Sequence, residues 1–348
     1  MKLLKWFFVL TLFAIVGAGL VSYQAYQNLI QPIAITAPQV YAVEKGSYLG
    51  RILYDLKQQG VITDDRWARY YAKYQQLENV KVGEFELQPG MTVVDVLHLL
   101  NSDKVLRYQV TLVEGKTSAD YLDQLRAHPK LKITTKGLSI EEIMSELGVE
   151  GKHPEGMFAP ETYTFSKGTS DFDILKQSFK RQEKVLAAAW AEKSSDLPIK
   201  SPYEALILAS IVEKETGVAR ERPEIAGVFV RRLQQNIRLQ TDPTVIYGLG
   251  DKYNGNLTRA HLKAYTPYNT YRINGLPPTP IANPGKDAIE AVLHPADGET
   301  LYFVAKGDGS HHFSKTLKEH INAVNKFQRF KRRKDYQSAP EAPKDGDG

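Results

Sequence analysis

The segment Tyr203–Gly217, YEALILASIVEKETG, constrains the fold of this chain more than any other part of the sequence. It is marked as a helix at both ends. Ser201 suits the N-cap, Pro202 suits the first helical position, and Glu204 stands where it completes a capping box with Ser201. Gly217 can end the last turn. The register of the helix can therefore be read from the sequence.

This register gives the two acids near the end of the helix different surroundings. At about 100° per residue, Glu215 falls among apolar side chains, whereas Glu213 falls on the opposite side, near Ser210. The apolar residues of the Glu215 side are Ile207, Leu208, Ile211 and Val212. Leu206 lies on the Glu213 side, so a helix buried nearly all round, with a smaller contrast between the acids, stays open.

The two surroundings predict different protonation. Burial disfavours a charged carboxylate, so we expect a raised pKa for Glu215, which can then donate a proton. We expect Glu213 to stay ionised, in solvent or in a salt bridge. The alternative for Glu215 is a structural ion pair with a buried arginine, and the helix alone does not separate the two.

A second constraint is the apolar run from Leu3 to Val21, which only Lys5 and Thr11 interrupt. About 19 residues are enough to cross a bilayer as a helix. Lys2 and Lys5 begin the run and no comparable basic cluster follows at once, so the positive-inside rule leaves the N-terminus in the cytoplasm. We predict that residues 1–24 are a cytoplasmic N-terminus and a single transmembrane anchor.

The competing interpretation of this run is a cleavable signal peptide. The small residues Gly17, Ala18 and Gly19 lie near a possible cleavage point. The run is long for a signal peptide, which favours the retained anchor. Either interpretation exports the bulk of the chain.

Composition excludes several other classes. The chain has 348 residues, 42% of them hydrophobic, which suffices for one or two cores and is too polar for several membrane spans. It has no cysteine, so disulfides, thiolate zinc sites and cysteine nucleophiles are impossible. The net charge of +5 is modest, and residues 331–348 are predicted to be a disordered basic tail. Export argues against nucleic acid as a partner.

Three short stretches share one spacing, in which two leucines stand seven and ten residues after a glycine. This spacing predicts a turn followed by a capped helix with buried leucines. Strand-like runs precede the second and third copies, at residues 84–87 and 108–113. The glycine and leucine sets are Gly46, Leu53 and Leu56; Gly90, Leu97 and Leu100; and Gly115, Leu122 and Leu125.

The remaining elements complete an α+β fold. Residues 134–197 read as mainly helical, with Phe172–Trp190 as the longest helix and a loop at Gly156–Tyr163. A further helix starts at Pro223, and Asp242 is expected to cap a short one. The predicted elements nearer the C-terminus are a helix at Lys286–Leu293, a strand at Leu301–Ala305 and a turn leading to His311–Phe313.

The polar residues of the C-terminal half suit a glycan better than a phosphate or a metal. Aromatic faces stack on sugar rings, while amides and hydroxyls pair with sugar hydroxyl and N-acetyl groups. The alternative is that the tyrosines are core residues and the amides are turn formers. A metal site built from His311, His312, His320 and Asp242 is disfavoured, because adjacent histidines on a strand face opposite ways and no HExxH spacing occurs.

The number of acids bears on the reaction. Glycosidases normally use two carboxylates. Asp242 is the best second candidate, but its place before Pro243 suggests a helix cap. A mechanism with one essential acid therefore fits this sequence better.

Five motifs in order, IVEKET, LQTDPTVIYG, YNTY, GLPPTPIANPG and HHF, resemble the endolytic murein transglycosylase family (MltG, YceG-like) from about Val40 to Phe330. The resemblance implies an inner-membrane, single-pass protein with a LysM-like wall-binding region at 38–130 and a periplasmic catalytic domain at 131–330. It implies peptidoglycan glycan strands and peptidoglycan synthases as partners, and neither a cofactor nor a metal.

The resemblance also implies an activity and a site. Proteins of this family cut glycan strands internally without water, leave 1,6-anhydro-N-acetylmuramic acid ends, and are thought to terminate nascent strands. The second glutamate of the E-K-E-T motif is catalytic, which here is Glu215. The residues that match other family motifs and are candidates for binding substrate are Gln240, Thr241, Asp242, Tyr247, Tyr268, Asn269, Tyr271 and His311.

Two other functions stay open from the sequence. A hydrolytic muramidase would share the fold and Glu215 but would release reducing ends. A non-catalytic wall-binding scaffold of the elongation or division machinery would not depend on Glu215.

Overall fold

The structure is a computed structural model that describes residues 2–330. It divides into two compact units, here called unit 1 (Met1–Gln109 and Thr164–Thr169) and unit 2 (Val110–Tyr163 and the described residues from Ser170 onward). The chain passes between the units in two strands, β3 (Arg107–Leu112) and β4 (Glu161–Ser166), which pair with each other. The predicted functional ranges 38–130 and 131–330 stay predictions, and residues 331–348 lie outside the described part.

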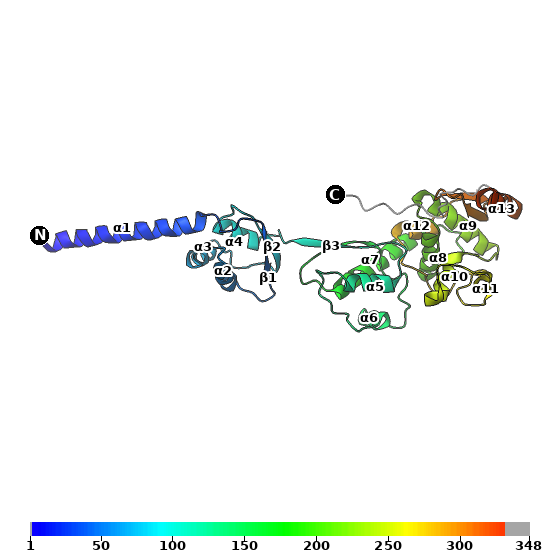
Figure 1. Cartoon of the computed structure of the whole chain (residues 1–348), viewed down its shortest axis with the longest axis horizontal. Coiled ribbons are helices and arrows are strands. Elements are labelled where there is room, and N and C mark those ends of the chain that lie inside the picture. The colour runs from blue at the N-terminus through cyan, green and yellow to red at the C-terminus, as the bar shows by residue number, and fades with distance from the viewer. Residues whose placement is uncertain (1, 331–348) are drawn as a thin grey trace. The chain divides into compact units, whose positions relative to one another are not determined.

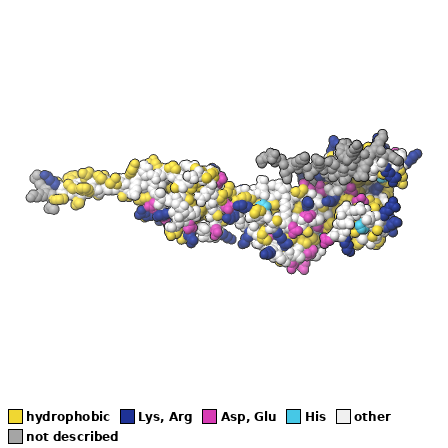
Figure 2. Space-filling view, in the orientation of Figure 1, with side chains coloured by type: hydrophobic (Ala, Val, Ile, Leu, Met, Phe, Trp, Pro, Cys, Tyr) yellow, Lys and Arg dark blue, Asp and Glu magenta, His cyan; other side chains and the backbone are white. Residues whose placement is uncertain are grey.

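Unit 1 begins with one long helix, α1 (Lys2–Ile30) (Figure 1). Leu4–Ile30 is apolar enough to cross a membrane, with a mean hydropathy of 2.1. Side chains from Leu4 to Gln24 are exposed, and hydrophobic atoms cover this stretch (Figure 2). The predicted anchor ends at residue 24, but the helix continues to Ile30. Its last residues pack on the rest of unit 1, because Leu29 contacts the core.

The rest of unit 1 is a small α/β assembly. Its strands pair antiparallel, with Gln39 opposite Leu87 and Val43 opposite Gly83. The elements in chain order are β1 (Gln39–Val43), α2 (Leu49–Gln58), α3 (Arg66–Tyr74), β2 (Gly83–Leu87) and α4 (Val93–Asn101).

The repeated glycine–leucine spacing is confirmed in both units. Gly46, Gly90 and Gly115 all have positive φ, at 89°, 88° and 73°, which explains the glycine because other residues rarely adopt this conformation. The helices that follow are α2, α4 and α5 (Ser118–Arg126). All six leucines are buried. Thr92 and Thr117 form reciprocal capping boxes, whereas the first copy has no side-chain cap.

Unit 2 surrounds α8 (Pro202–Glu215), the helix expected from the opening segment. This helix packs against α7 (Asp171–Ala191), α9 (Arg222–Gln234), α10 (Asp242–Leu249) and α12 (Lys286–Leu293) (Figure 1). Every residue from Ala205 to Val212 is buried, so α8 is apolar all round, as the position of Leu206 allowed. The other elements are α6 (Ile140–Glu146), α11 (Arg259–Lys263), β5 (Tyr302–Ala305), β6 (His311–Ser314) and α13 (Leu317–Val324).

One expectation about unit 2 was wrong in part. The predicted loop at 156–163 ends at Pro160, and residues 161–166 form β4, although 164–166 were expected in a mainly helical region. The sequence TYTF alternates β-branched and aromatic residues, which favours a strand. Tyr163 and Phe165 are buried, so this strand carries one apolar face.

Candidate active site

The N-terminus of α8 is capped nearly as predicted. The Ser201 hydroxyl accepts a hydrogen bond from the backbone N–H of Glu204 at 3.2 Å, and Pro202 takes the first position. In a full capping box the Glu204 carboxylate would accept a hydrogen bond from the backbone N–H of Ser201. Here it accepts instead from the backbone N–H of Lys200, at 2.7 Å. The expected start of α8 is therefore correct, but Ser201 and Glu204 form only one of the two hydrogen bonds of a capping box.

Glu215 is the last residue of α8, and its carboxyl accepts a hydrogen bond from the Thr241 hydroxyl. Burial raises the pKa of Glu215 to about 7, against a smaller lowering by the Thr241 bond, and the charge of Asp242 raises it further. The residue as a whole keeps partial exposure. A carboxyl in this state is half protonated near neutral pH and can both give and take a proton.

The predicted cap role of Asp242 was wrong. Thr241 occupies the N-cap of α10 without a side-chain capping bond, and Asp242 is the first helical residue. The Asp242 carboxylate instead accepts a hydrogen bond from the Tyr271 hydroxyl at 2.7 Å. Asp242 is exposed, so a second acid faces solvent close to the Glu215 carboxyl.

Buried threonines hold Thr241 in place. The Thr241 N–H donates to the Thr270 hydroxyl at 3.0 Å, and the hydroxyls of Thr244 and Thr270 are 2.9 Å apart. Thr241, Thr244 and Thr270 are all at most 3% exposed. The orientation of the hydroxyl that contacts Glu215 is therefore fixed by the interior rather than by solvent.

Arg232 supports the residue before Thr241. Its buried guanidinium donates to the carbonyl of Leu239 at 3.0 Å and to the side-chain oxygen of Gln240 at 3.3 Å. Gln240 is exposed and has a φ of 53°, an uncommon conformation for a residue other than glycine. Sequence reasoning missed Arg232, because a single arginine on an amphipathic helix carries no signal of its burial.

Three of the remaining candidates lie in or beside the segment 268–271. The rings of Tyr247 and Tyr268 meet edge to face at 5.1 Å, and the Tyr268 hydroxyl is 2.8 Å from that of Thr279. The Asn269 amide nitrogen donates to three backbone carbonyls, those of His261, Leu262 and Ala264. These bonds make Asn269 a loop anchor in this structure.

His311 lies at the start of β6 and is buried against Glu221. Its ring Nδ1 and its backbone N–H are 2.8 Å and 3.0 Å from the two Glu221 oxygens. Thr216, which follows Glu215, directs its hydroxyl to the same carboxylate at 3.5 Å. Glu221 thus connects His311 to the end of α8 through hydrogen bonds to both. No sequence pattern distinguishes the largely buried Glu221 from its half-buried neighbour Glu224.

Glu213 differs from Glu215 as predicted, since it forms a salt bridge. One oxygen is 2.9 Å from the Arg222 guanidinium, and the other accepts the Gly285 N–H at 2.9 Å. The side chain is only 4% exposed. Glu213 also lines a cavity of about 290 Å³, with Glu114 and Gln182. The lining of this cavity does not include Glu215, so the two acids belong to separate sites.

A second glutamate in unit 2 has a similarly raised pKa. Burial raises the pKa of Glu155 to about 7. Both of its oxygens accept from the Ser118 N–H, at 3.1 and 3.2 Å. The Glu155 carboxyl thus holds the start of α5, whereas Glu215 lies close to the exposed carboxylate of Asp242. Geometry therefore favours Glu215 where pKa alone leaves two candidates.

Among residues 2–330, no group of three or more His, Cys, Asp or Glu side chains could hold a metal ion. The groups around Glu215 include the Thr241 hydroxyl, the Asp242 carboxylate and the Tyr271 hydroxyl, beside a carboxyl that can transfer a proton.

The comparisons with known proteins agree on one family. The model of the YceG-like family matches residues 41–326. An endolytic murein transglycosylase of Bacillus subtilis is 32% identical over 323 residues, covering 86% of this chain and 88% of that protein. One of Streptococcus pneumoniae is 26% identical over 355 residues, covering 91% of this chain and 64% of that protein.

A solved structure supports the same assignment. The crystal structure of a putative YceG-like protein from Listeria monocytogenes is 32% identical, with a TM-score of 0.51. The match covers 82% of this chain and 98% of that one. The sequence motifs, the α8 site and these matches agree, and the chain belongs to the YceG-like family.

Proposed function

We propose that this chain is a membrane-anchored endolytic lytic transglycosylase of peptidoglycan in which Glu215 is the catalytic acid and base. The observation that carries the proposal is the position of the Glu215 carboxyl, at the end of a buried helix, bonded by the Thr241 hydroxyl and close to the exposed Asp242. Its pKa, raised to about 7, agrees with this role. The relatives named endolytic murein transglycosylases support the substrate.

In the first step, protonated Glu215 donates its proton to the glycosidic oxygen between N-acetylmuramic acid and N-acetylglucosamine. The bond from C1 of the muramic residue to this oxygen breaks, and the oxygen leaves as the hydroxyl of the N-acetylglucosamine. Burial supplies the protonated form at neutral pH, and the Thr241 hydroxyl fixes the carboxyl in one orientation.

In the second step, the Glu215 carboxylate takes the proton of the muramoyl C6 hydroxyl while that oxygen bonds to C1. The product carries a 1,6-anhydro ring, and no water is consumed. Glu215 ends the cycle protonated, so one residue serves both steps. A pKa close to the working pH suits both directions of transfer.

We propose that exposed and partly exposed groups near Glu215 bind the strand. Gln240, Asp242 and Tyr271 present amide, carboxylate and hydroxyl groups there, and Tyr247 and Tyr268 offer aromatic surface near them in the chain. We assign Thr241 and Asn269 to holding these groups in position. His311, paired with Glu221, is proposed to support the end of α8.

A hydrolytic muramidase is the second candidate, because Asp242 lies close enough to Glu215 for its charge to raise the Glu215 pKa. Two carboxylates are what hydrolytic glycosidases use. The engagement of Asp242 by the Tyr271 hydroxyl favours a binding role instead.

Location and partners complete the proposal. We propose that α1 is a single-pass inner-membrane anchor with the N-terminus in the cytoplasm and both units in the periplasm. In unit 1, two antiparallel strands flank two helices, and we propose that this region is the LysM-like wall-binding part. Peptidoglycan synthases are proposed partners, since the proposed reaction ends strands that they extend.

Digestion of purified glycan strands in heavy-oxygen water tests the reaction type. The proposal predicts fragments whose muramic ends are lighter by one water than reducing ends and carry no heavy oxygen. Reducing ends labelled with heavy oxygen would establish the muramidase instead. Intact strands after prolonged incubation would favour the non-catalytic scaffold.

A further inference from the structure

The short helix α3 in unit 1 carries a row of three aromatic rings, of which two are exposed and that of Trp67 is half-buried. Tyr70 and Tyr74 are 69% and 82% exposed, and the Trp67 ring lies 6.2 Å from that of Tyr70. The opposite face packs inward through Ala68 and Ala72, both fully buried. Trp67, Tyr70 and Tyr74 therefore form a row at helical spacing, here called the α3 aromatic stripe, that does not belong to the core.

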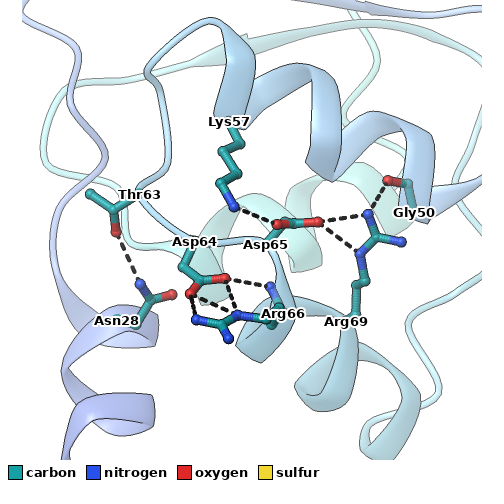
Figure 3. Close-up of polar contacts among 8 residues, drawn as sticks. All are labelled: Asn28, Gly50, Lys57, Thr63, Asp64, Asp65, Arg66 and Arg69. Carbon is teal, nitrogen blue, oxygen red and sulfur yellow. Dashed lines mark hydrogen bonds and ion pairs between the residues drawn. The ribbon is translucent and has the colours of Figure 1, made fainter.

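The start of α3 is attached to the last turn of α1. The Asn28 side-chain amide donates to the Thr63 hydroxyl at 2.9 Å (Figure 3), and Thr63 lies just before α3. The two helices also pack on each other. Because α3 has only nine residues, it extends roughly 13 Å at about 1.5 Å per residue. The whole stripe therefore stays close to the end of α1.

Ion pairs fix the direction in which α3 leaves this point. Asp65 binds Arg69 at 2.6 Å and Lys57 at 3.0 Å, and Arg69 also donates to the Gly50 carbonyl of α2 at 2.9 Å (Figure 3). Asp65 is only 8% exposed. The orientation of the stripe relative to α1 is thus set by the structure of unit 1.

Aromatic residues on α1 indicate where a membrane surface would lie. Trp6 is 68% exposed near the start of the helix, and Tyr23 and Tyr26 are 64% and 58% exposed near its end. The rise from Trp6 to Tyr23 is roughly 26 Å at 1.5 Å per residue, close to the hydrocarbon thickness of about 30 Å. Tryptophan and tyrosine favour the two interfaces, so the second interface falls at Tyr23 to Tyr26.

We propose that the α3 aromatic stripe lies in the lipid headgroup layer, as a second membrane contact beside α1. This inference rests on the proposed membrane anchor. Asn28, which holds α3, follows Tyr26 by less than one helical turn, so α3 starts at headgroup height. Tyrosine and tryptophan suit this layer because each has an apolar body and a polar tip.

Positive charge next to the α3 aromatic stripe also favours lipid headgroups as the binding partner. Lys73 is exposed on the same helix, where a cation can approach lipid phosphates, whereas the exposed Arg66 is paired with Asp64 at 2.6 Å (Figure 3). A glycan strand is the alternative occupant, because sugars also stack on aromatic rings. The attachment of α3 to the end of a membrane-length helix favours lipid. Two contacts, α1 and the stripe, would fix the tilt of unit 1 on the membrane.

Single-tryptophan forms of the full chain test this inference. The chain has three tryptophans, so Trp6→Phe with Trp190→Phe leaves only Trp67. In vesicles of phosphatidylglycerol and phosphatidylethanolamine with bromine on the upper acyl chain, Trp67 fluorescence is expected to be quenched and blue-shifted. Adding Tyr70→Ser and Tyr74→Ser is expected to reduce this quenching, since these changes weaken the contact without touching the buried face.

A matched form separates failure of this inference from failure of the anchor. Trp67→Phe with Trp190→Phe leaves Trp6, which reports insertion of α1. Quenching of Trp6 without quenching of Trp67 would overturn the inference while the anchor stands. Quenching of neither would overturn both. A Trp67 signal that ignores brominated lipid but shifts when glycan strands are added would assign the stripe to glycan.

Discussion

At the scale of single residues, three buried glutamates of unit 2 show how surroundings set function. Glu213 is ion-paired with Arg222, Glu155 accepts hydrogen bonds from the Ser118 N–H, and Glu215 accepts one from the Thr241 hydroxyl. The helical register predicted the contrast between Glu213 and Glu215. It did not reveal Glu155, whose burial depends on packing between distant segments.

The groups that set the pKa of Glu215 predict opposite pH shifts for two variants. Activity should fall as pH rises through about 7, because the first step needs the protonated acid. Thr241→Val removes a hydrogen bond that lowers the pKa, so this fall should move to higher pH. Asp242→Asn removes a charge that raises the pKa, so the fall should move to lower pH. Profiles of kcat/KM against pH measure both shifts, and two unshifted profiles would contradict the electrostatic description.

The raised pKa of Glu215 also predicts a stability effect. Between pH 4.5, the ordinary value, and about pH 7, the folded chain keeps a proton that the unfolded chain has lost, so stability falls as pH rises through this window. The cost is on the order of 3 kcal/mol when complete. Glu215→Gln removes it, so the variant should gain free energy of unfolding relative to wild type across the window and level off above it.

Urea unfolding at several pH values, with the exposed Glu183→Gln as the matched control, measures this difference. A gap between Glu215→Gln and wild type that stays constant from acid to neutral pH would count against the assigned pKa.

At the scale of elements, the predictions that depended on local sequence signals were the most accurate. Positive-φ glycines and buried leucines identified α2, α4 and α5, with threonine caps at α4 and α5, while serine, proline and the apolar pattern identified α8. The strand β4 was missed because its pairing with β3 joins segments far apart in sequence. The Asp242 cap failed for a related reason, since the Tyr271 hydroxyl that binds the carboxylate comes from a later loop.

The ion pair that links α8 to α9 is predicted to matter for stability. Arg222→Met leaves the Glu213 carboxylate, 4% exposed, without its partner. Breaking a buried pair costs roughly 3–5 kcal/mol. Lys286→Met, which breaks a pair with 67% and 47% exposed side chains, should cost less than about 1 kcal/mol. Equal losses for the two variants in denaturant titrations would show that Glu213 finds another partner.

At the scale of the whole molecule, the sequence predicted an anchor followed by exported units, and the helix Leu4–Ile30 is long and apolar enough for it. The division into two compact units was harder to predict. Residues 164–169 belong to unit 1 although they lie between segments of unit 2. The composition along the chain does not indicate that residues 164–169 belong to unit 1.

The anchor predicts how the full chain partitions. Because exposed apolar side chains surround α1 from Leu4 to Gln24, the chain should stay in the membrane pellet after an alkaline carbonate wash. Leu10→Arg with Phe13→Arg places two charges near the centre of the apolar run, at a cost of several kcal/mol in a bilayer, and should move the chain to the soluble fraction. Release of the unaltered chain would contradict the anchor.

The most direct test of the central claim compares the rate of glycan-strand cleavage by wild type, Glu215→Gln and Glu155→Gln. Both glutamates have a pKa raised to about 7, so the pair separates a catalytic acid from a buried one. The proposal predicts that Glu215→Gln loses roughly a hundredfold or more, while Glu155→Gln, whose amide oxygen can still accept from Ser118, keeps cleaving strands to anhydro ends. Cleavage by Glu215→Gln at the wild-type rate would contradict it.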